Sequence, residues 1–308
     1  MKTAYISHPK CLRHDAGDDH PESPGRLHAI EDRLIAAGLF DLLCHFEAPE
    51  IGREALLRVH SPGYVESLQA MAPTQGFFRL DPDTIMCPAT LEAAYRAAGA
   101  ATLAVDLLMS GQADNAFCCV RPPGHHAERS QAMGLCLLNN IAAGAAHALE
   151  AHGMERVAIV DFDVHHGNGT ENIFLNDDRV LFCSTFEHPF YPFTPLLENN
   201  AHRISVPLDA SAKSSEFRAA VTEQWLPALN SFQPEIVFVS AGFDAHRDDD
   251  MSHVSLEDAD FLWVSERIAE VARRSASGRI VSTLEGGYEL RSLARCVEVH
   301  LRVFMGQV

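Results

Sequence analysis

Short, unbroken apolar runs alternate with helical stretches along most of this 308-residue chain. Residues 236–239 (Ile-Val-Phe-Val) carry no polar side chain, which is typical of a strand whose two faces are both covered. Strands are expected at residues 3–7, 116–120, 156–160, 180–184, 204–206, 236–240 and 279–284. Helices are expected at residues 24–37, 90–110, 140–152, 215–230, 256–275 and 290–305. The alternation predicts an α/β fold with a mostly parallel sheet between two helical layers.

No repeat, low-complexity tract or linker divides the chain, so residues 1–308 are predicted to form a single domain. Neither a bilayer-spanning apolar segment nor a signal peptide is evident, which predicts a cytoplasmic protein without a membrane partner. The eight cysteines form no Cys-x-x-Cys pair and are expected to be packed as reduced thiols. The net charge of −18 argues against nucleic acid as a direct ligand. The charge weakly favours a cationic substrate, but acidity that merely maintains solubility is the better explanation.

Four polar motifs follow four of the expected strands at their carboxyl ends. They are residues 121–126 (Arg-Pro-Pro-Gly-His-His), 161–170 (Asp-Phe-Asp-Val-His-His-Gly-Asn-Gly-Thr), 241–244 (Ala-Gly-Phe-Asp) and 285–288 (Glu-Gly-Gly-Tyr). Ligands of open parallel sheets bind beyond the carboxyl ends of the strands. The four motifs therefore predict one site at that edge of the sheet.

The second motif indicates a metal site. Asp161, Asp163 and His165 are spaced two apart, so in an extended chain their side chains point to the same side. A catalytic zinc usually has three protein ligands and one open position. Asp163 and His165 supply two ligands, and Asp244, at the end of its own strand, is the best third. Zinc is the first choice for this set and ferrous iron is the second.

The remaining motifs suit proton transfer and charge stabilisation. His125 or His126 can accept a proton from an activated water, and Asp161 and Asn168 can hold their Nδ1 atoms. A carboxylate partner raises the pKa of a histidine, so the His125–Asp161 pair is expected to be the more basic one. The hydroxyl of Tyr288 can stabilise an oxyanion. Taken singly, a surface histidine pair or a packed turn tyrosine would explain these residues, but together they predict metal-assisted hydrolysis of an amide.

These motifs, with their flanking residues, resemble those of the histone deacetylase and acetylpolyamine amidohydrolase superfamily, in order from about residue 5 to about residue 305. Residues 20–27 (His-Pro-Glu-Ser-Pro-Gly-Arg-Leu) also resemble an N-terminal element of that family. Asn168 and the Phe before Asp244 resemble the class II branch, as in a bacterial-type member. The resemblance implies an arginase-like three-layer α/β/α sandwich. It also implies roles for eight residues, namely zinc ligands Asp163, His165 and Asp244, catalytic histidines His125 and His126 with partners Asp161 and Asn168, and Tyr288 as the group that polarises the carbonyl.

The resemblance further implies structural potassium or sodium and a substrate channel. One monovalent site would use Asp161, Asp163, His165, Ser184 and the carbonyl of Thr185, and a second would lie near Phe174, Asp177 and Val180. Arg26 would sit in the inner channel behind the metal. Asp83 falls where the family has a rim residue that binds the amide hydrogen of the substrate.

The chain departs from the family pattern around the mouth of that channel. Gly134 is followed by Leu135 where the family usually has an aromatic residue, so one wall is expected to be aliphatic, with Tyr191 or Phe190 opposite. Met251 stands near the position where polyamine-selective relatives carry a glutamate, which counts against a polyamine specialist. Residues 186–195 and 248–253 also differ. These changes affect the expected substrate and not the reaction.

The leading prediction is a zinc-dependent deacetylase acting on acetyl-lysine in a peptide or protein, or on a similar small acylated amine. One alternative is a deacetylase of acetylpolyamines or other small molecules. An arginase-like ureohydrolase would need two metals and more aspartate ligands. An inactive acyl-lysine binding module would be expected to lack a zinc ligand or Tyr288, and this chain retains both. Substrate identity, acyl-chain length and assembly into a homo-oligomer stay open at this point.

Overall fold

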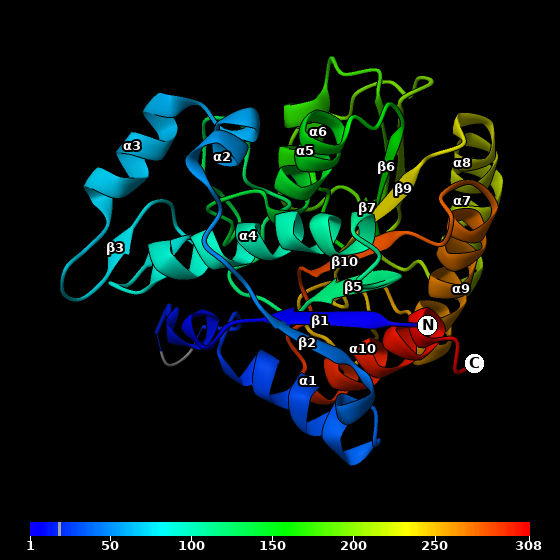
Figure 1. Ribbon diagram of the computed structural model, residues 1–308, viewed down its shortest axis with the longest axis horizontal. Helices are drawn as coiled ribbons and strands as arrows, with labels where there is room; N and C mark the ends of the chain where they lie inside the picture. Colours follow the sequence, from blue (N-terminus) through cyan, green and yellow to red (C-terminus); the bar gives the residue numbers. More distant parts are fainter. Residues whose placement is uncertain (18–19) are drawn as a thin grey trace.

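The computed structural model describes residues 1–17 and 20–308 and has three layers, with a central sheet between two groups of helices (Figure 1). The eight-stranded sheet has the order β2-β1-β5-β10-β9-β6-β7-β8, and all its neighbouring strands are parallel. Its strands are β1 Thr3–Ser7, β2 Cys44–Glu47, β5 Asn115–Cys118, β6 Val157–Asp161, β7 Val180–Glu187, β8 Arg203–Leu208, β9 Ile236–Ala241 and β10 Ile280–Leu284. The predicted α/β/α sandwich is confirmed.

The two helical layers cover opposite faces of the sheet (Figure 1). One layer contains α4 (Thr90–Met109) and α5 (Asn140–His152), and the other contains α1 (Gly25–Ala36), α9 (Asp258–Ser275) and α10 (Leu290–Met305). Shorter elements complete the chain: α2 Arg53–Val59, α3 Pro62–Met71, α6 Asn168–Phe174, α7 Ser214–Ala220, α8 Leu226–Phe232 and the antiparallel pair β3 Phe78–Arg79 and β4 Ile85–Met86. None of the helices in the described part of the chain has the length and apolarity that a bilayer crossing requires.

The expected helix at residues 215–230 is interrupted. The structure has α7 and α8 on either side of a π-helical turn, Val221–Trp225. Pro227 lies in the first turn of α8, and inside one continuous α-helix its ring would clash with the carbonyl of Glu223. The wider π turn avoids that clash.

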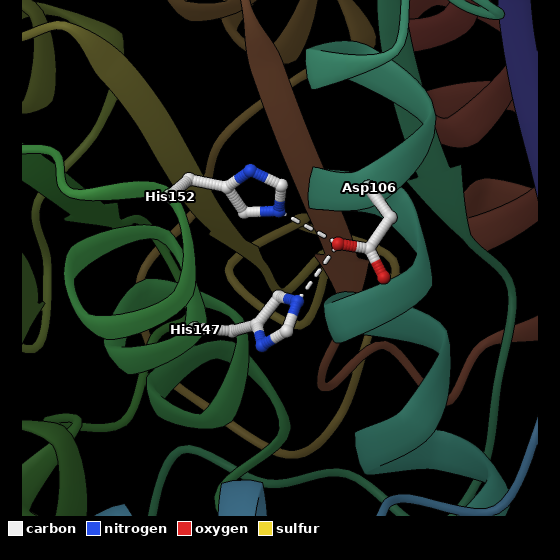
Figure 2. A group of neighbouring side chains, drawn as sticks. All are labelled: Asp106, His147 and His152. Carbon is white, nitrogen blue, oxygen red and sulfur yellow. Dashed lines mark hydrogen bonds and ion pairs between the residues drawn. The ribbon is translucent and has the colours of Figure 1, made fainter.

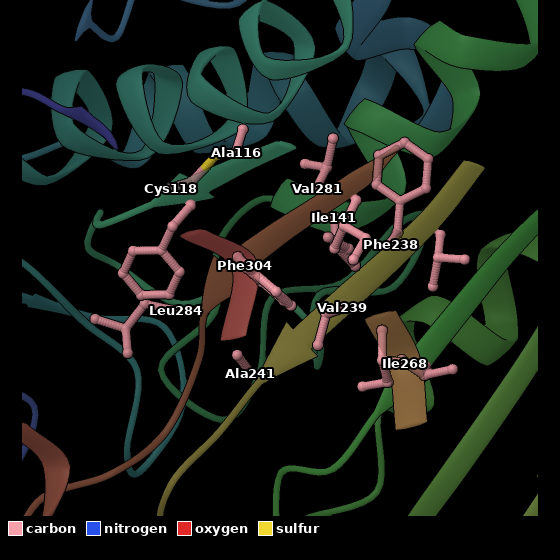
Figure 3. Close-up of a cluster of buried hydrophobic side chains, with 14 of the residues drawn as sticks. Ala116, Cys118, Ile141, Phe238, Val239, Ala241, Ile268, Val281, Leu284 and Phe304 are labelled. Carbon is pink, nitrogen blue, oxygen red and sulfur yellow. The ribbon is translucent and has the colours of Figure 1, made fainter. Parts of the chain in front are cut away.

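The apolar runs are buried on both faces, as their composition predicted. Figure 3 shows side chains of β5, β9 and β10 packed with Ile141 of α5, Ile268 of α9 and Phe304 of α10. Phe238 and Val239 of β9 are both fully buried, although successive side chains of a strand point to opposite faces. All eight cysteines are free thiols, and Cys44 is the one that is not buried.

The strand order brings the polar motifs together. β5, β10, β9 and β6 are consecutive neighbours in the sheet, and each is followed directly by one of the four motifs. Because the strands are parallel, their carboxyl ends lie at the same edge. The four motifs therefore meet at the centre of that edge.

Candidate active site

Three side chains at this edge form a candidate metal centre. Asp163 and His165 follow β6 and Asp244 follows β9, and their ligand atoms all lie within 4.8 Å of one another. The Nδ1 atom of His165 is 3.1 Å from Asp163 Oδ1 and 3.1 Å from Asp244 Oδ2. All three residues are buried. The structure thus brings together the three ligands expected from the sequence.

The surroundings of this centre fit a divalent cation. A Cβ atom on Gly286 would lie 2.1 Å from Asp244 Oδ2, and one on Gly242 would lie 2.1 Å from Asp163 Oδ2, so only bare backbone fits against the carboxylates. Burial and the neighbouring Asp163 carboxylate raise the pKa of Asp244 to about 6. Two buried carboxylates beside one imidazole need a compensating positive charge. One nitrogen and two carboxylate oxygens are a donor set that zinc and ferrous iron both accept.

The two adjacent histidines follow β5. Their loop is held by a carboxylate that follows β10, the neighbouring strand in the sheet. Backbone N–H groups of Gly124 and His125 donate to Glu285 Oε2 at 2.7 and 3.1 Å. The side chain of Ser240 donates to the other oxygen of Glu285 at 3.2 Å. The imidazole rings of His125 and His126 lie with their centroids 4.0 Å apart. Glu285 therefore fixes the loop that carries both rings.

Different partners hold the two imidazoles. His125 Nδ1 lies 2.9 Å from Asp161 Oδ2, and His126 Nδ1 lies 2.8 Å from Asn168 Oδ1. The amide nitrogen of Asn168 donates to Glu128 Oε1 at 2.8 Å, which orients its oxygen toward His126. His126 must therefore carry its proton on Nδ1 when it is neutral, and its Nε2 is left with a lone pair.

The pKa values of the two rings move in opposite directions. Burial alone would lower the pKa of His125, but the carboxylates of Asp163 and Asp161 outweigh it and hold that pKa well above its ordinary value. Burial and the adjacent His125 hold the pKa of His126 well below its ordinary value. At neutral pH His126 is thus a neutral base, and His125 is a fixed positive charge.

Tyr288 lies beside this group at the end of the loop after β10. Its backbone N–H donates to Asp249 Oδ2 at 2.6 Å, and the N–H of Glu289 donates to the same oxygen at 2.9 Å. Gly287 has a φ of 115°, a conformation that suits glycine. Burial and the Asp244 carboxylate hold the pKa of Tyr288 well above its ordinary value. The phenol therefore remains a hydrogen-bond donor at neutral pH.

A cavity of about 610 Å³ opens onto these groups. His126, His165 and Tyr288 line it, together with five residues expected to bind substrate, namely Asp83, Gly134, Leu135, Tyr191 and Met251. Phe190 also lines the cavity and stacks on His165 at a centroid distance of 5.5 Å. Leu135 has a φ of 69°, which a branched side chain rarely adopts, and its N–H donates to the Thr84 hydroxyl at 3.1 Å. The cavity lining thus has an aliphatic residue, Leu135, together with the aromatic side chains of Phe190 and Tyr191.

Comparison with known proteins decides the family. Residues 20–304 match the family model described as the histone deacetylase domain. The chain belongs to the histone deacetylase family. It superposes on the crystal structure of the HD domain of HDA15 with a TM-score of 0.92 and 31% identity, covering 100% of this chain and 91% of that one. The fold is that of this family.

Relatives of different lengths share this deacetylase domain. A probable deacetylase of Archaeoglobus fulgidus is 35% identical, covering 94% of this chain and 82% of the relative. The mouse polyamine deacetylase HDAC10 is 35% identical over 99% of this chain, and type-2 histone deacetylase 2 of Dictyostelium discoideum is 32% identical over 99%. The chain spans only 48% and 21% of those two proteins. By its family, the protein is an amide hydrolase of the deacetylase type.

Arg26 of this deacetylase does not line the cavity. It lies beneath residues 285–288, which we call the tyrosine loop. It donates to the carbonyl oxygens of Gly287, at 2.6 Å, and of Glu285, and its guanidinium lies 5.0 Å from the centroid of the Tyr288 ring. Glu22, fully buried, accepts from Arg26 at 3.2 Å and binds the guanidinium of Arg121 through both its oxygens. The arginine thus supports the loop and does not face the cavity.

The residues expected to bind monovalent cations lie in two places behind the deacetylase site. Asp161 and Ser184 are direct neighbours across β6 and β7, and both are fully buried. Thr185 follows on β7 and is buried as well. The second group, Phe174, Asp177 and Val180, lines a small cavity of about 40 Å³.

Several residues that shape the deacetylase site were not singled out from the sequence. Glu285 and Asp249 hold the two catalytic loops, Glu128 orients Asn168, and Glu22 and Arg121 form the buried ion pair. Glu285 had a sequence signal, because it is the charged residue of a strand-end motif. Asp249 lies in a run of three aspartates that resembles a solvated stretch, although it is 5% exposed. His166, which had no expected role, lies 3.3 Å from Glu171 Oε2.

Proposed function

We propose that this protein is a zinc-dependent deacetylase that removes acetyl or related acyl groups from lysine side chains or similar amines. The observation that carries the proposal is the meeting of three kinds of group at one cavity. His165 of the metal set, His126 with a free Nε2 lone pair, and the protonated phenol of Tyr288 all line it. Metal-assisted hydrolysis of an amide needs an electrophile, a base and an oxyanion donor, and the cavity offers all three.

A divalent ion held by Asp163, His165 and Asp244 would polarise the substrate carbonyl and lower the pKa of water to about 7. His126 takes the proton of the attacking water on Nε2, because Asn168 keeps the other proton on Nδ1. Tyr288 donates its hydroxyl hydrogen bond to the carbonyl oxygen as negative charge develops there. His126 then gives its proton to the leaving amine nitrogen, so that amide and water become carboxylate and amine.

His125 has a different part in this proposal. Its contact with Asp161 and its raised pKa keep it positively charged, so it is a poor proton acceptor. The charge offsets the buried carboxylates and favours the negative charge of the transition state. Potassium or sodium beside Asp161, Ser184 and Thr185 would add further positive charge to offset the buried carboxylates.

The cavity lining bears on the substrate. Leu135 and Met251 are apolar, Tyr191 and Phe190 are aromatic, and Asp83 is the acidic residue of the lining. This lining suits the aliphatic stem of an acylated lysine. Relatives named polyamine deacetylases make acetylpolyamines the second candidate substrate, and the acidic chain suits them, but Met251 offers no carboxylate for a second ammonium group.

The first test measures metal and acetate together. We expect about one catalytic zinc per chain, release of acetate from a fluorogenic acetyl-lysine peptide, and loss of both on chelation, with recovery when Zn²⁺ is returned. Parallel assays with acetylated polyamines, and with Fe²⁺ under anaerobic conditions, identify the substrate and the metal. A metal-loaded protein that hydrolyses none of these acylated amines would refute the proposal.

A change in the partner of His126 should move the pH dependence. Asn168→Asp combined with Glu128→Gln places a carboxylate beside Nδ1, which raises the pKa of His126. His126 must be unprotonated to act as the base, so the acid limb of the kcat/KM profile should shift to higher pH. Glu128→Gln alone should leave the limb in place. An unshifted limb in the double variant would exclude His126 as the base.

A further inference from the structure

A second group of potential metal ligands lies between the two helices of one layer. Asp106 of α4 faces His147 and His152 of α5, and all three side chains point into the same gap (Figure 2). The Nε2 atoms of His147 and His152 lie 2.8 and 2.7 Å from the same atom, Asp106 Oδ1. Since α4 and α5 lead into the starts of β5 and β6, the group lies toward the sheet edge opposite the active site.

The packing of the two helices fixes this convergence. α4 and α5 are rich in alanine, and a Cβ atom on Gly144 of α5 would lie 3.1 Å from Ala101 of α4, so the backbones approach closely. His147 and His152 occupy the last turns of α5, and their rings meet edge to face at a centroid distance of 5.4 Å. The ligand atoms are therefore held by two packed helices and not by a mobile loop.

The electrostatic environment favours a cation here. α4 ends at Met109 and α5 ends at His152, so both helices direct their negative ends toward the group. The chain as a whole carries a net charge of −18. Arg58 donates to His147 Nδ1 at 3.2 Å, but its charge is paired with Glu54 at 2.8 Å. The side chains of His147 and His152 are 16% and 24% exposed, which leaves a path for an ion from solvent.

We propose that Asp106, His147 and His152 form a second divalent metal site, for zinc or a similar late first-row ion, separate from the active site. Two imidazole nitrogens and one carboxylate oxygen, with water in the remaining position, are a donor set that zinc accepts. Metal–ligand distances of about 2.0–2.2 Å place the ligand atoms somewhat farther apart than the present hydrogen bonds do. The side chain of Asp106 is 51% exposed, so it is free to rotate and supply that space. Each ring then carries its proton on Nδ1, and Arg58 turns away from His147.

The site would join α4 to α5. Because neither helix end contributes to the catalytic cavity, the expected effect of the ion is on stability and not on turnover. An ion that binds the folded chain alone raises the stability in proportion to the logarithm of its free concentration over its Kd. Zinc at the catalytic centre stabilises the fold in the same way, so the distinguishing property of this site is that its loss leaves turnover unchanged.

The test is calorimetric titration of Zn²⁺ alone into the full chain, with thermal unfolding measured in parallel. We expect the unaltered protein to bind one equivalent more than His147→Gln or His152→Gln, and to show a larger rise in Tm with zinc than either variant, which keeps the catalytic site alone. His28→Gln removes an exposed histidine elsewhere and should behave like the unaltered protein. Asp163→Asn with Asp244→Asn should remove the catalytic equivalent of zinc and keep the equivalent bound at Asp106, His147 and His152. The two variants therefore measure zinc binding at each site separately. Equal zinc uptake by the unaltered protein and both histidine variants would overturn the proposal.

Discussion

Replacing Tyr288 with phenylalanine is expected to lower kcat about 10²–10³-fold, the usual loss when one oxyanion donor is removed. The phenol lines the cavity, and its pKa is held well above its ordinary value, so the role proposed for it is to donate a hydrogen bond. The substitution leaves the ring, and with it the contact to Arg26, in place. KM and zinc content should therefore change little, because the lost interaction forms as charge develops in the transition state.

Tyr191→Phe is the matched control for this prediction. Tyr191 also lines the cavity, where its ring meets His126 edge to face at 5.3 Å, but its hydroxyl has no part in the proposed chemistry. This variant should keep most of its kcat. Steady-state kinetics and metal analysis of both variants make the comparison. A Tyr288→Phe enzyme within a few-fold of the unaltered protein would exclude the proposed oxyanion donor.

Replacing Glu22 with alanine is expected to destabilise the protein by about 3–5 kcal/mol, as removal of one partner of a buried ion pair does. Glu22 is fully buried and accepts from Arg121, Arg26 and His14. Its loss leaves two buried guanidinium groups without a counter-charge. Because Arg26 also supports the tyrosine loop, activity should fall together with stability.

Urea unfolding at pH 7 measures this effect, and Glu66→Ala is the control. Glu66 forms an exposed pair with Arg53 at 3.3 Å, so its removal should cost less than about 1 kcal/mol. Burial alone would raise the pKa of Glu22, but Arg121 and His14 hold it well below the ordinary value. The stabilisation is therefore complete above the unfolded-state pKa and is lost only as the pH falls through the lower folded-state value. A cost at pH 7 no greater than that of Glu66→Ala would contradict the prediction.

The sequence predicted the parts of the fold that local pattern determines. The apolar run at β9 and the glycine-containing motif after β6 were sufficient to predict a parallel sheet with reactive loops at one edge. The order of the strands was not predictable, since β10 lies between β5 and β9 through contacts that join distant parts of the chain. β2 was missed because its alternately exposed residues, Cys-His-Phe-Glu, do not resemble the buried strands.

The residues of the candidate site also fall into those that the sequence predicted and those that it did not. Residues inside the motifs, such as His126 and Asn168, were predicted because their chemistry and spacing are visible along the chain. Glu128 and Asp249 were not, because their roles depend on which backbone or amide group the fold brings to them. A carboxylate in a loop acquires such a role only through tertiary structure.

Asp249 also joins two parts of the cavity lining that come from different loops. One of its oxygens accepts the N–H of Met251 at 3.1 Å, and the other accepts the N–H groups of Tyr288 and Glu289. Met251 of the cavity lining and Tyr288, the proposed oxyanion donor, are thus held by a single side chain. A bulkier acyl chain that displaces Met251 would displace Tyr288 as well. A substrate that fits poorly against Met251 is therefore expected to bind but to react slowly.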